Sequence, residues 1–503
     1  MTITELQQQY AAHPNTAVME RLLKDASVQT IFCGGLCASS ASLFSSVLVK
    51  QDVCPFVFVL GDLEEAGYFY HDLTQVLGTE KVFFFPSSFR RSIKYGQKDA
   101  ANEILRTEVL SRLQKGEEGL CIVTYPDALA EKVVSRKELS DKTLKLNVGE
   151  KLDTTFITDV LHSYGFEYVD YVYEPGQYAV RGSIIDVFSF ASEYPYRIDF
   201  FGDEVESIRT FEVESQLSRE RKEGVAIVPD LAVTGDVTTS FLDFIPKETV
   251  LAMRDFLWLR ERIQVVHDEA LTPQAIAVQE AEENGGITLE GKLIDGSEFT
   301  VRALDFRRME FGNKPTGTPD AKISFHTSVQ PIFHKNFDLV AGSFKDYLEQ
   351  GYSLYICSDS TKQTDRIRAI FEDRGDKIQF TPVVRTIHEG FVDHTLHLCI
   401  FTDHQLFDRF HKYNLKSDKA RSGKVALSLK ELNQFTPGDY VVHTDHGIGR
   451  FSGLVRIPNG DTTQEVLKLV FQNEDVVFVS IHSLHKVSKY KGKDGEAPRL
   501  NKL

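Results

Sequence analysis

Two adjacent glycines, Gly34 and Gly35, follow an apolar run and precede a helical pattern, which is where a phosphate-binding loop would lie. Nucleotide chemistry at such a turn needs G-x-x-x-x-G-K-[ST], because the backbone amides and the lysine hold the phosphates and the hydroxyl binds Mg²⁺. The segment GGLCASSAS contains no lysine, and G-K-[ST] occurs nowhere in the chain. We therefore expect a plain strand-to-helix turn and no bound cofactor.

Metal chemistry has two weak candidates in this sequence. Cys33 and Cys37 form a C-x-x-x-C pair without a second pair, and two H-x-x-H pairs occur at residues 443–446 and 482–485. Structural zinc sites usually include several thiolates, so we expect core packing and turns at these positions rather than metal. G-x-S-x-G and H-E-x-x-H are also absent. The sequence offers no catalytic constellation, which favours an adaptor.

The segment from Glu174 to Phe211 predicts a small antiparallel sheet, because apolar and polar residues alternate along it. Within YRIDFF, alternation assigns three residues to the core face of a strand: Tyr196, Ile198 and Phe200. The opposite face then carries Arg197, Asp199 and Phe201.

An arginine and an aromatic residue exposed on one strand face fit a protein-binding hot spot. The alternative is that Phe201 packs under a neighbouring domain, and that Arg197 pairs with Asp199 or Asp203. The residue pattern alone favours neither interpretation.

The composition is that of a soluble multidomain protein. The chain has 503 residues, 42% of them apolar, and a formal net charge of −16. This length predicts about three to five domains, and the charge argues against a surface that coats nucleic acid. No apolar run is long enough to span a membrane, so we expect a cytoplasmic protein with no membrane partner.

Apolar periodicity predicts a multidomain α/β fold. Strands alternate with helical patterns in residues 1–136, an α+β module occupies 137–230, and an α/β portion at 231–321 returns to the first sheet. A further α/β unit follows at 322–411. Residues 412–434 are polar and rich in lysine, which is typical of a linker, and short regular strands in residues 435–503 predict a small β-barrel.

Two blocks of sequence carry a family resemblance. EPGQYAVRGSIIDVF with YPYRIDFFGDEVESIRTF resembles the module shared by the excision-repair protein UvrB and the transcription-repair coupling factors of the Mfd family. GDYVVHTDHGIGRFSGL, near the C-terminus, resembles the RNA polymerase-interacting domain of the coupling factors, which is also seen in CarD-type regulators and is absent from UvrB.

The resemblance implies a specific architecture. Residues 1–136 and 231–321 would form a UvrB-like α/β domain with a degenerate P-loop, and 137–230 would be a UvrA-binding module inserted in it. Residues 322–411 would be a flavodoxin-like spacer, and 435–503 a Tudor/SH3-like barrel.

The resemblance also implies the contact residues. Those for UvrA would be Arg181, Arg197 and Phe201. Contact with the RNA polymerase β subunit would fall on the strand after HGIGR, chiefly on Ile457, with Arg456 and Leu454 beside it. The alternative for Ile457 is a place in the barrel core.

Members of this family continue into an ATP-dependent DNA translocase motor, whereas this chain ends at RLNKL. We expect an N-terminal fragment or a natural short form that does not hydrolyse ATP, with DNA contacted mainly through the absent motor. The predicted function is the adaptor part of a coupling factor, which docks on stalled RNA polymerase and recruits UvrA for nucleotide excision repair. The alternatives are a UvrB-like damage-verifying ATPase and a CarD-like transcription regulator.

Overall fold

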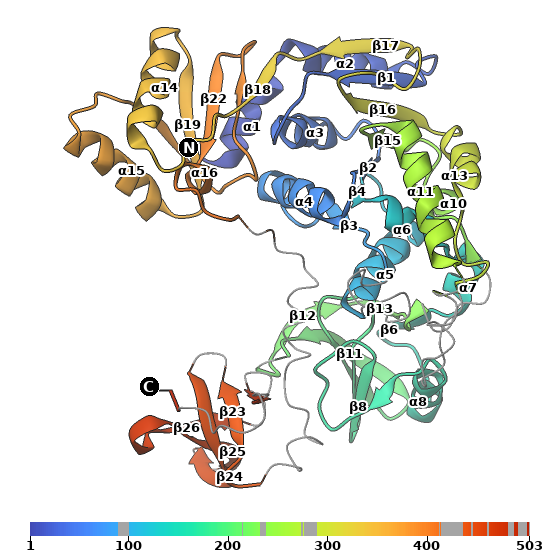
Figure 1. Ribbon diagram of the computed structural model, residues 1–503. Coiled ribbons are helices and arrows are strands. Elements are labelled where there is room, and N and C mark those ends of the chain that lie inside the picture. The colour runs from blue at the N-terminus through green and yellow to red at the C-terminus, as the bar shows by residue number, and fades with distance from the viewer. Residues whose placement is uncertain are drawn as a thin grey trace. The chain divides into compact units, whose positions relative to one another are not determined.

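The structure is a computed structural model, which describes residues 1–88, 100–213, 215–231, 238–272, 275, 289–411, 413, 436–443, 446–459, 462–480, 487–490 and 500–501. The chain divides into two compact units. The first contains residues 1–141 and 235–415, and the second contains residues 142–234 and 416–503 (Figure 1). The fold is mixed α/β, with a parallel sheet in the first unit and a small antiparallel sheet near the C-terminus, as the sequence predicted.

A parallel sheet of seven strands forms the centre of the first unit. Its strands are β1 (Thr30–Gly34), β2 (Phe56–Val59), β3 (Val82–Phe84), β4 (Cys121–Thr124), β15 (Val250–Met253), β16 (Arg307–Gly312) and β17 (Ala321–Ser324). Every residue of β2, β4 and β15 is buried. Such continuous apolar runs are typical of parallel strands that are covered on both faces.

The strand order of this sheet is β17-β1-β16-β15-β2-β4-β3. Strands β15 and β16 therefore lie between β1 and β2, although residues 142–234 separate them from both in the sequence. Because β1 and β2 do not pair with each other, the sheet is complete only when both portions of the first unit are present.

Helices pack on both faces of the seven-stranded sheet (Figure 1). The helices of this part of the first unit are α1 (Ile3–Ala11), α2 (Pro14–Lys24), α3 (Ser40–Gln51), α4 (Leu63–Leu77), α5 (Ala100–Gln114), α6 (Pro126–Ala130), α7 (Arg136–Asp141), α10 (Phe241–Phe244), α11 (Phe256–Ala270) and α13 (Gly296–Ala303). Helices α4, α11 and α13 are each capped at the N-terminus by an aspartate, namely Asp62, Asp255 and Asp295. Each of these carboxylates accepts a hydrogen bond from a backbone amide in the first turn of its helix. A short antiparallel pair, β5 (Val133–Val134) and β14 (Thr238–Thr239), lies beside the points where the chain leaves and re-enters this unit.

A second, five-stranded sheet also belongs to the first unit. Its strands are β18 (Thr327–Val329), β19 (Ser353–Ser358), β20 (Thr381–Val384), β21 (Phe391–Asp393) and β22 (Leu398–Thr402), in the order β18-β21-β22-β19-β20. Helices α14 (Phe337–Glu349), α15 (Thr361–Asp373) and α16 (Asp403–Leu406) accompany it. Phe344, Phe371 and Phe401 pack together in its core.

Residues 142–234 form a six-stranded sheet and a helix. The sheet order is β12-β11-β10-β9-β8-β7, from β7 (Glu167–Tyr168), β8 (Gln177–Arg181), β9 (Ile184–Val187), β10 (Tyr196–Phe201), β11 (Glu204–Phe211) and β12 (Ser218–Lys222). Helix α8 (Thr154–Ser163) and the pair β6 (Leu144–Asn147) and β13 (Gly224–Ile227) complete this inserted module. One face of the sheet packs with Leu146, Ile157 and Leu161 into a single apolar core.

The C-terminal residues form a five-stranded antiparallel sheet. Its order is β26-β25-β24-β23-β27, from β23 (Tyr440–His443), β24 (Gly447–Asn459), β25 (Thr462–Val470), β26 (Val476–Ser480) and β27 (Val487–Lys489), with a 3₁₀ turn at Gln472–Glu474. Phe451, Leu467 and Leu469 lie in its core. The linker predicted at 412–434 lies outside the described residues apart from Tyr413.

Four histidines meet in the first unit, where α4 packs beside segments of the second sheet: His71, His388, His404 and His411. The ring centroids of His404 and His411 are 4.3 Å apart, and those of His71 and His411 are 5.0 Å apart. Burial and the neighbouring imidazoles lower the pKa of His71, His388 and His404 to about 4. The cluster is therefore neutral at pH 7.

This histidine cluster predicts that acid destabilises the first unit. The unfolded chain takes up protons on these histidines below about pH 6.5, whereas the folded unit does not until about pH 4. Buried Asp72, whose pKa is raised to about 6, has the opposite effect, because it takes up one proton in the folded unit before it does so in the unfolded chain. Stability should fall by about 1.4 kcal/mol per pH unit for each net proton taken up.

The measurement is the urea midpoint at pH 7.5, 6 and 5, followed by fluorescence of Trp258, the single tryptophan, which lies in α11. His71→Gln should reduce the dependence on pH, whereas the control change His162→Gln, at an exposed position of α8, should leave it unaltered. An equal dependence in wild type and His71→Gln would contradict the assignment.

Candidate protein-interaction sites

Strand register places the predicted residues of the inserted module on one face of its sheet. Ile198 and Phe200 are buried in the core, as alternation predicted. On the opposite face, Arg197 of β10 lies directly across from Asp186 of β9 and from Arg209 of β11.

A buried carboxylate, that of Asp186, joins two of the predicted residues. Arg197 donates from Nε to Oδ1 and from Nη2 to Oδ2, both at 2.8 Å. Arg181 of β8 also forms an ion pair with Oδ2. Because Asp186 has no exposed surface, its charge is compensated by these two guanidinium groups rather than by water.

Arg197 is largely buried, which corrects the expectation of an exposed arginine on this face. Its side chain is 15% exposed, its guanidinium lies 4.5 Å from the centroid of the Phe211 ring, and Nη1 donates to the carbonyl of Gln216 at 3.1 Å. Hydrogen bonding to Asp186 raises its pKa. Asp199, one of the two partners considered from the sequence, instead pairs with Arg209.

Phe201, the last residue of β10, is 81% exposed. The Arg181 side chain is 35% exposed, and its guanidinium lies 5.0 Å from the Tyr171 ring centroid. The structure thus brings Arg181 and Arg197 together on one carboxylate and presents Phe201 to solvent on the same sheet. Sequence reasoning did not single out Asp186, although an aspartate inside the apolar run SIIDVF was a signal for a buried ion pair.

In the C-terminal sheet, the predicted residues lie on β24. Gly447 to Arg450 pair with β23, whereas Gly453 to Asn459 pair with β25 on one side only, among the strands that the structure describes. That half of β24 therefore has a free edge within the described residues. Leu454 is 42% exposed, and the side chains of Arg456 and Ile457 lie outside what the structure describes.

The loop at Gly34 and Gly35 is occupied by the chain itself. Gly35 has φ +85°, and a Cβ there would lie 2.0 Å from the carbonyl oxygen of Phe325. Thr327 Oγ1 donates to the carbonyl of Gly35 at 2.6 Å and accepts from the amide of Cys37 at 3.1 Å. Residues 325–327 therefore fill the space beside Gly35, and Thr327 takes the amide hydrogen bond of Cys37.

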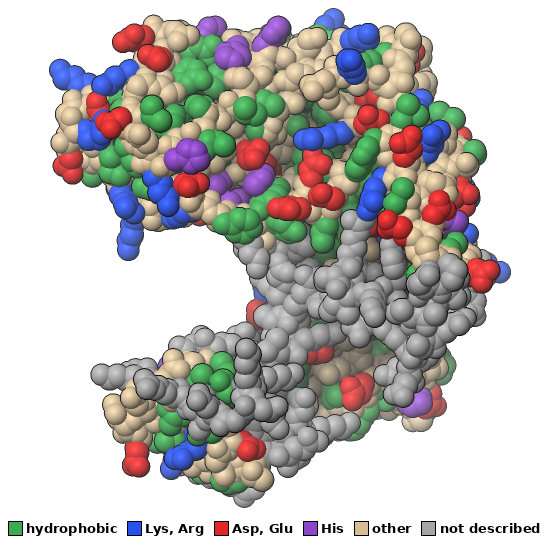
Figure 2. All heavy atoms as spheres, viewed as in Figure 1, with side chains coloured by type: hydrophobic (Ala, Val, Ile, Leu, Met, Phe, Trp, Pro, Cys, Tyr) green, Lys and Arg blue, Asp and Glu red, His purple; other side chains and the backbone are tan. Residues whose placement is uncertain are grey.

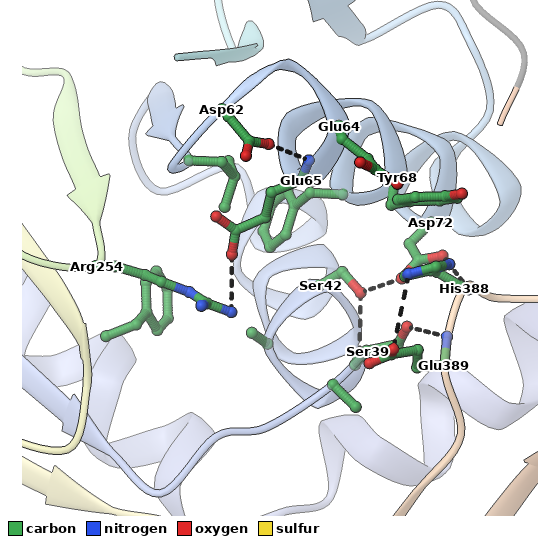
Figure 3. A pocket seen from close by; sticks show the side chains of 15 residues that line it. Ser39, Ser42, Asp62, Glu64, Glu65, Tyr68, Asp72, Arg254, His388 and Glu389 are labelled. Atoms are coloured by element: carbon green, nitrogen blue, oxygen red, sulfur yellow. Dashed lines mark hydrogen bonds and ion pairs between the residues drawn. The ribbon is translucent and has the colours of Figure 1, made fainter. Parts of the chain in front are cut away.

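A pocket of about 330 Å³ lies next to this loop (Figure 3). Five carboxylate residues line it: Asp62, Glu64, Glu65, Asp72 and Glu389. Of these, Glu65 forms an ion pair with Arg254 at 2.8 Å. Figure 2 shows red acidic and purple histidine side chains on this face of the first unit. Five carboxylates against one arginine, Arg254, give the pocket lining an excess of acidic groups, which disfavours a polyphosphate.

Asp72 anchors one wall of the pocket. Its carboxylate accepts from Ser42 Oγ and from the backbone amide of His388, both at 2.7 Å, and burial raises its pKa to about 6. The amide of Glu389 donates to Ser39 Oγ at 2.9 Å (Figure 3). These bonds connect α3 and α4 with residues 388–389 of the second sheet.

The described residues contain no group of three or more histidine, cysteine, aspartate or glutamate side chains arranged to hold a metal ion. His482 and His485, named from the sequence, lie outside those residues. No helix in the described part of the chain has the length and apolar character needed to cross a membrane.

The fold and these sites define a multidomain α/β protein that carries a separate β-rich module within its sequence and another at its C-terminal end. The UvrB interaction domain matches residues 144–232, and the CarD-like/TRCF RID domain matches residues 435–491. The first match contains Arg181, Asp186, Arg197 and Phe201, and the second contains the free edge of β24.

Over most of its length the chain is homologous to transcription-repair-coupling factors. It is 24% identical to the transcription-repair-coupling factor of Staphylococcus aureus (strain bovine RF122 / ET3-1), over 93% of this chain and 46% of that protein. It is also 24% identical to that of Staphylococcus haemolyticus (strain JCSC1435), over 94% of this chain and 46% of that protein. The chain spans about half the length of the relatives it matches.

The shared carboxylate predicts that Asp186→Ala destabilises the inserted module by about 3 kcal/mol, because Arg197 would keep a largely buried charge without a counterion. Hydrogen exchange of β9 and β10 amides measures this free energy. Glu220→Ala removes an exposed ion pair with Lys222 in the same module, and its cost should be much smaller because solvent screens this pair. Equal costs for the two variants would contradict the role of Asp186.

Proposed function

We propose that this chain is the adaptor portion of a transcription-repair coupling factor, which recruits UvrA through the inserted module and docks on the RNA polymerase β subunit through the C-terminal sheet. One observation carries the proposal: a UvrB interaction domain and a CarD-like/TRCF RID domain match the same chain, at 144–232 and 435–491. The long homology to coupling factors supports it. In this role the chain marks stalled polymerase for nucleotide excision repair.

In this proposal the first unit is a scaffold without catalysis. Its seven-stranded sheet is a UvrB-like domain with a degenerate P-loop, its second sheet is a flavodoxin-like spacer, and the C-terminal sheet is a Tudor/SH3-like barrel. The contacts of Thr327 with the Gly35 loop and the carboxylates of the neighbouring pocket support a first unit that neither binds nor hydrolyses ATP.

The two recognition surfaces use different physical interactions. On the inserted module, the exposed Phe201 ring lies on the same sheet face as Arg181, which is partly exposed and paired with Asp186, so this face offers apolar area together with a charged group. On the C-terminal sheet, half of β24 has no second strand partner among the described residues, and such an edge suits addition of a strand from a partner sheet. The pairing of Ile457 with Gln464 of β25 places Ile457 on this half of β24.

Replacing Arg181, Arg197 and Phe201 together with alanine should abolish capture of UvrA, because it removes the apolar contact and the charged groups behind it. Phe201→Ala alone should weaken capture about tenfold, and it should leave the module folded because this side chain is exposed. The measurement is the Kd of the purified 503-residue chain for UvrA.

A matched control changes Arg260, Arg368 and Phe410 to alanine, which are exposed residues of the first unit. This control should bind UvrA as the wild type does. If the triple change in the inserted module retained wild-type affinity, the assignment of the UvrA surface would be wrong.

Ile457→Arg should abolish binding to the RNA polymerase β subunit, because a charged side chain would disrupt packing of the added strand against β24. Phe478→Arg, at an exposed position of β26 in the same sheet, serves as the control and should retain binding. Binding is measured by capture of the β subunit, and folding by hydrogen exchange of β25. A folded Ile457→Arg variant that still binds would refute the assignment, and loss of exchange protection would instead place Ile457 in the core.

A further inference from the structure

The buried state of Arg197 raises the question of how it influences a partner. All three of its guanidinium nitrogens have acceptors within the module: Asp186 receives Nε and Nη2, and Gln216 receives Nη1. Phe211 lies against the guanidinium at 4.5 Å. A partner surface can therefore contact little of Arg197. A substitution of Arg197 would instead change the groups that it binds, which are Asp186, Gln216 and Phe211.

One of the groups held by Arg197 is the loop between β11 and β12. Gln216 has φ +57°, a left-handed conformation that is uncommon outside glycine and costs free energy unless other contacts enforce it. The Gln216 amide donates to the carbonyl of Glu212 at 2.8 Å, and the Gln216 side chain donates to the carbonyl of Val213 at 2.8 Å. The carbonyl of Gln216 accepts a hydrogen bond from Arg197. Arg197 is thus one of the contacts that stabilise this loop.

Leu217 follows directly after Gln216 and is exposed to 68%. Its carbonyl accepts from the amide of Glu212 at 2.9 Å, so its backbone is held while its side chain faces solvent. Leu217 pairs with Glu212, which lies beyond the Tyr196 end of β10, whereas Phe201 is at the opposite end of that strand. The two residues are therefore separated by more than the length of β10, which is about 17 Å. One standard interface, of about 800 Å² per partner, covers both positions.

The charges around these two apolar residues indicate the chemistry of the partner. Arg197, Arg209 and Arg221 lie directly across from one another on three neighbouring strands. Arg197 and Arg209 are paired with Asp186 and Asp199, whereas Arg221 is exposed on the edge strand β12. The face therefore favours a partner surface that combines acidic groups with apolar pockets.

We propose that Arg197 is a positioning residue for UvrA binding, which fixes the Gln216 carbonyl and thereby presents Leu217 as a second apolar anchor in addition to Phe201. This inference rests on the proposed function and extends it, because it assigns Leu217 to the interface and moves Arg197 from direct contact to support. Arg181 and Phe201 remain contact residues.

The experiment measures the Kd of the 503-residue chain for UvrA in four variants: Leu217→Ala, Arg197→Lys, Arg197→Met and the double variant Arg197→Met with Leu217→Ala. Leu217→Ala should weaken binding about tenfold. Arg197→Lys should weaken it as much as Arg197→Met, because lysine keeps the charge but cannot bind Asp186 through two nitrogens and reach Gln216 as well. The double variant should bind no more weakly than the weaker single variant, since both changes remove the same contact.

Hydrogen exchange of residues 212–217 supplies an independent readout. Exchange in this loop should increase in Arg197→Lys and Arg197→Met but not in Leu217→Ala, whose backbone bonds are retained. Val301→Ala is the matched control, because Val301 of α13 is also exposed to 68% and lies outside the module. It should leave both readouts unchanged.

The outcomes separate this inference from the proposed function. If the wild-type chain does not bind UvrA, the proposed function fails. If wild type binds and Phe201→Ala weakens binding, but Leu217→Ala stays within twofold of wild type, the inference about Leu217 is wrong while the proposed function stands. Additive effects in the double variant, or wild-type binding by Arg197→Lys, would overturn the positioning role of Arg197.

Discussion

The buried carboxylate of Asp186 is the interaction on which the candidate UvrA-binding face depends. A charge without solvent access is tolerated only when it is paired and hydrogen-bonded, and here two arginines from neighbouring strands provide that compensation. The pairing determines what remains for a partner. Because of this pairing, Arg197 is largely buried and Arg181 is partly exposed. Phe201 is therefore the most accessible of the three predicted residues.

The first unit contains a parallel sheet with helices, and the turn after β1 lacks the groups that bind a phosphate in nucleotide-binding loops. A left-handed Gly35 follows β1, as such a loop requires, but residues 325–327 occupy the space beside it, and Thr327 accepts the amide hydrogen bond of Cys37. The neighbouring pocket is lined by carboxylates, one of which, Asp72, binds the backbone at His388. Contacts between segments of the chain therefore take the place of a ligand beside this loop. They also connect the two sheets of the unit. This arrangement agrees with the scaffold role that we propose.

The inserted module and the C-terminal sheet offer two kinds of recognition surface. The first depends on side chains set in rows across strands, where burial and pairing decide which of them reach solvent. The second depends on a strand edge, where half of β24 lacks a partner among the described residues. A chain with both surfaces is suited to hold two different proteins, which is the property that an adaptor between polymerase and repair requires.

The sequence by itself determined the fold class and the kinds of module, because buried parallel strands are continuous apolar runs and half-buried antiparallel strands alternate. It also assigned Ile198 and Phe200 to the core, and its two motif blocks identified the homology to coupling factors. Only the tertiary structure decided the state of Arg197, since its partners Asp186 and Gln216 are 11 and 19 residues away along the chain. Alternation specifies the face on which a side chain lies, but strand register and loop conformation determine what it meets there. For the same reason the lack of a lysine near Gly35 could be read from the sequence, whereas the chain segment that fills the loop lies 290 residues further on and became apparent only from the folded chain.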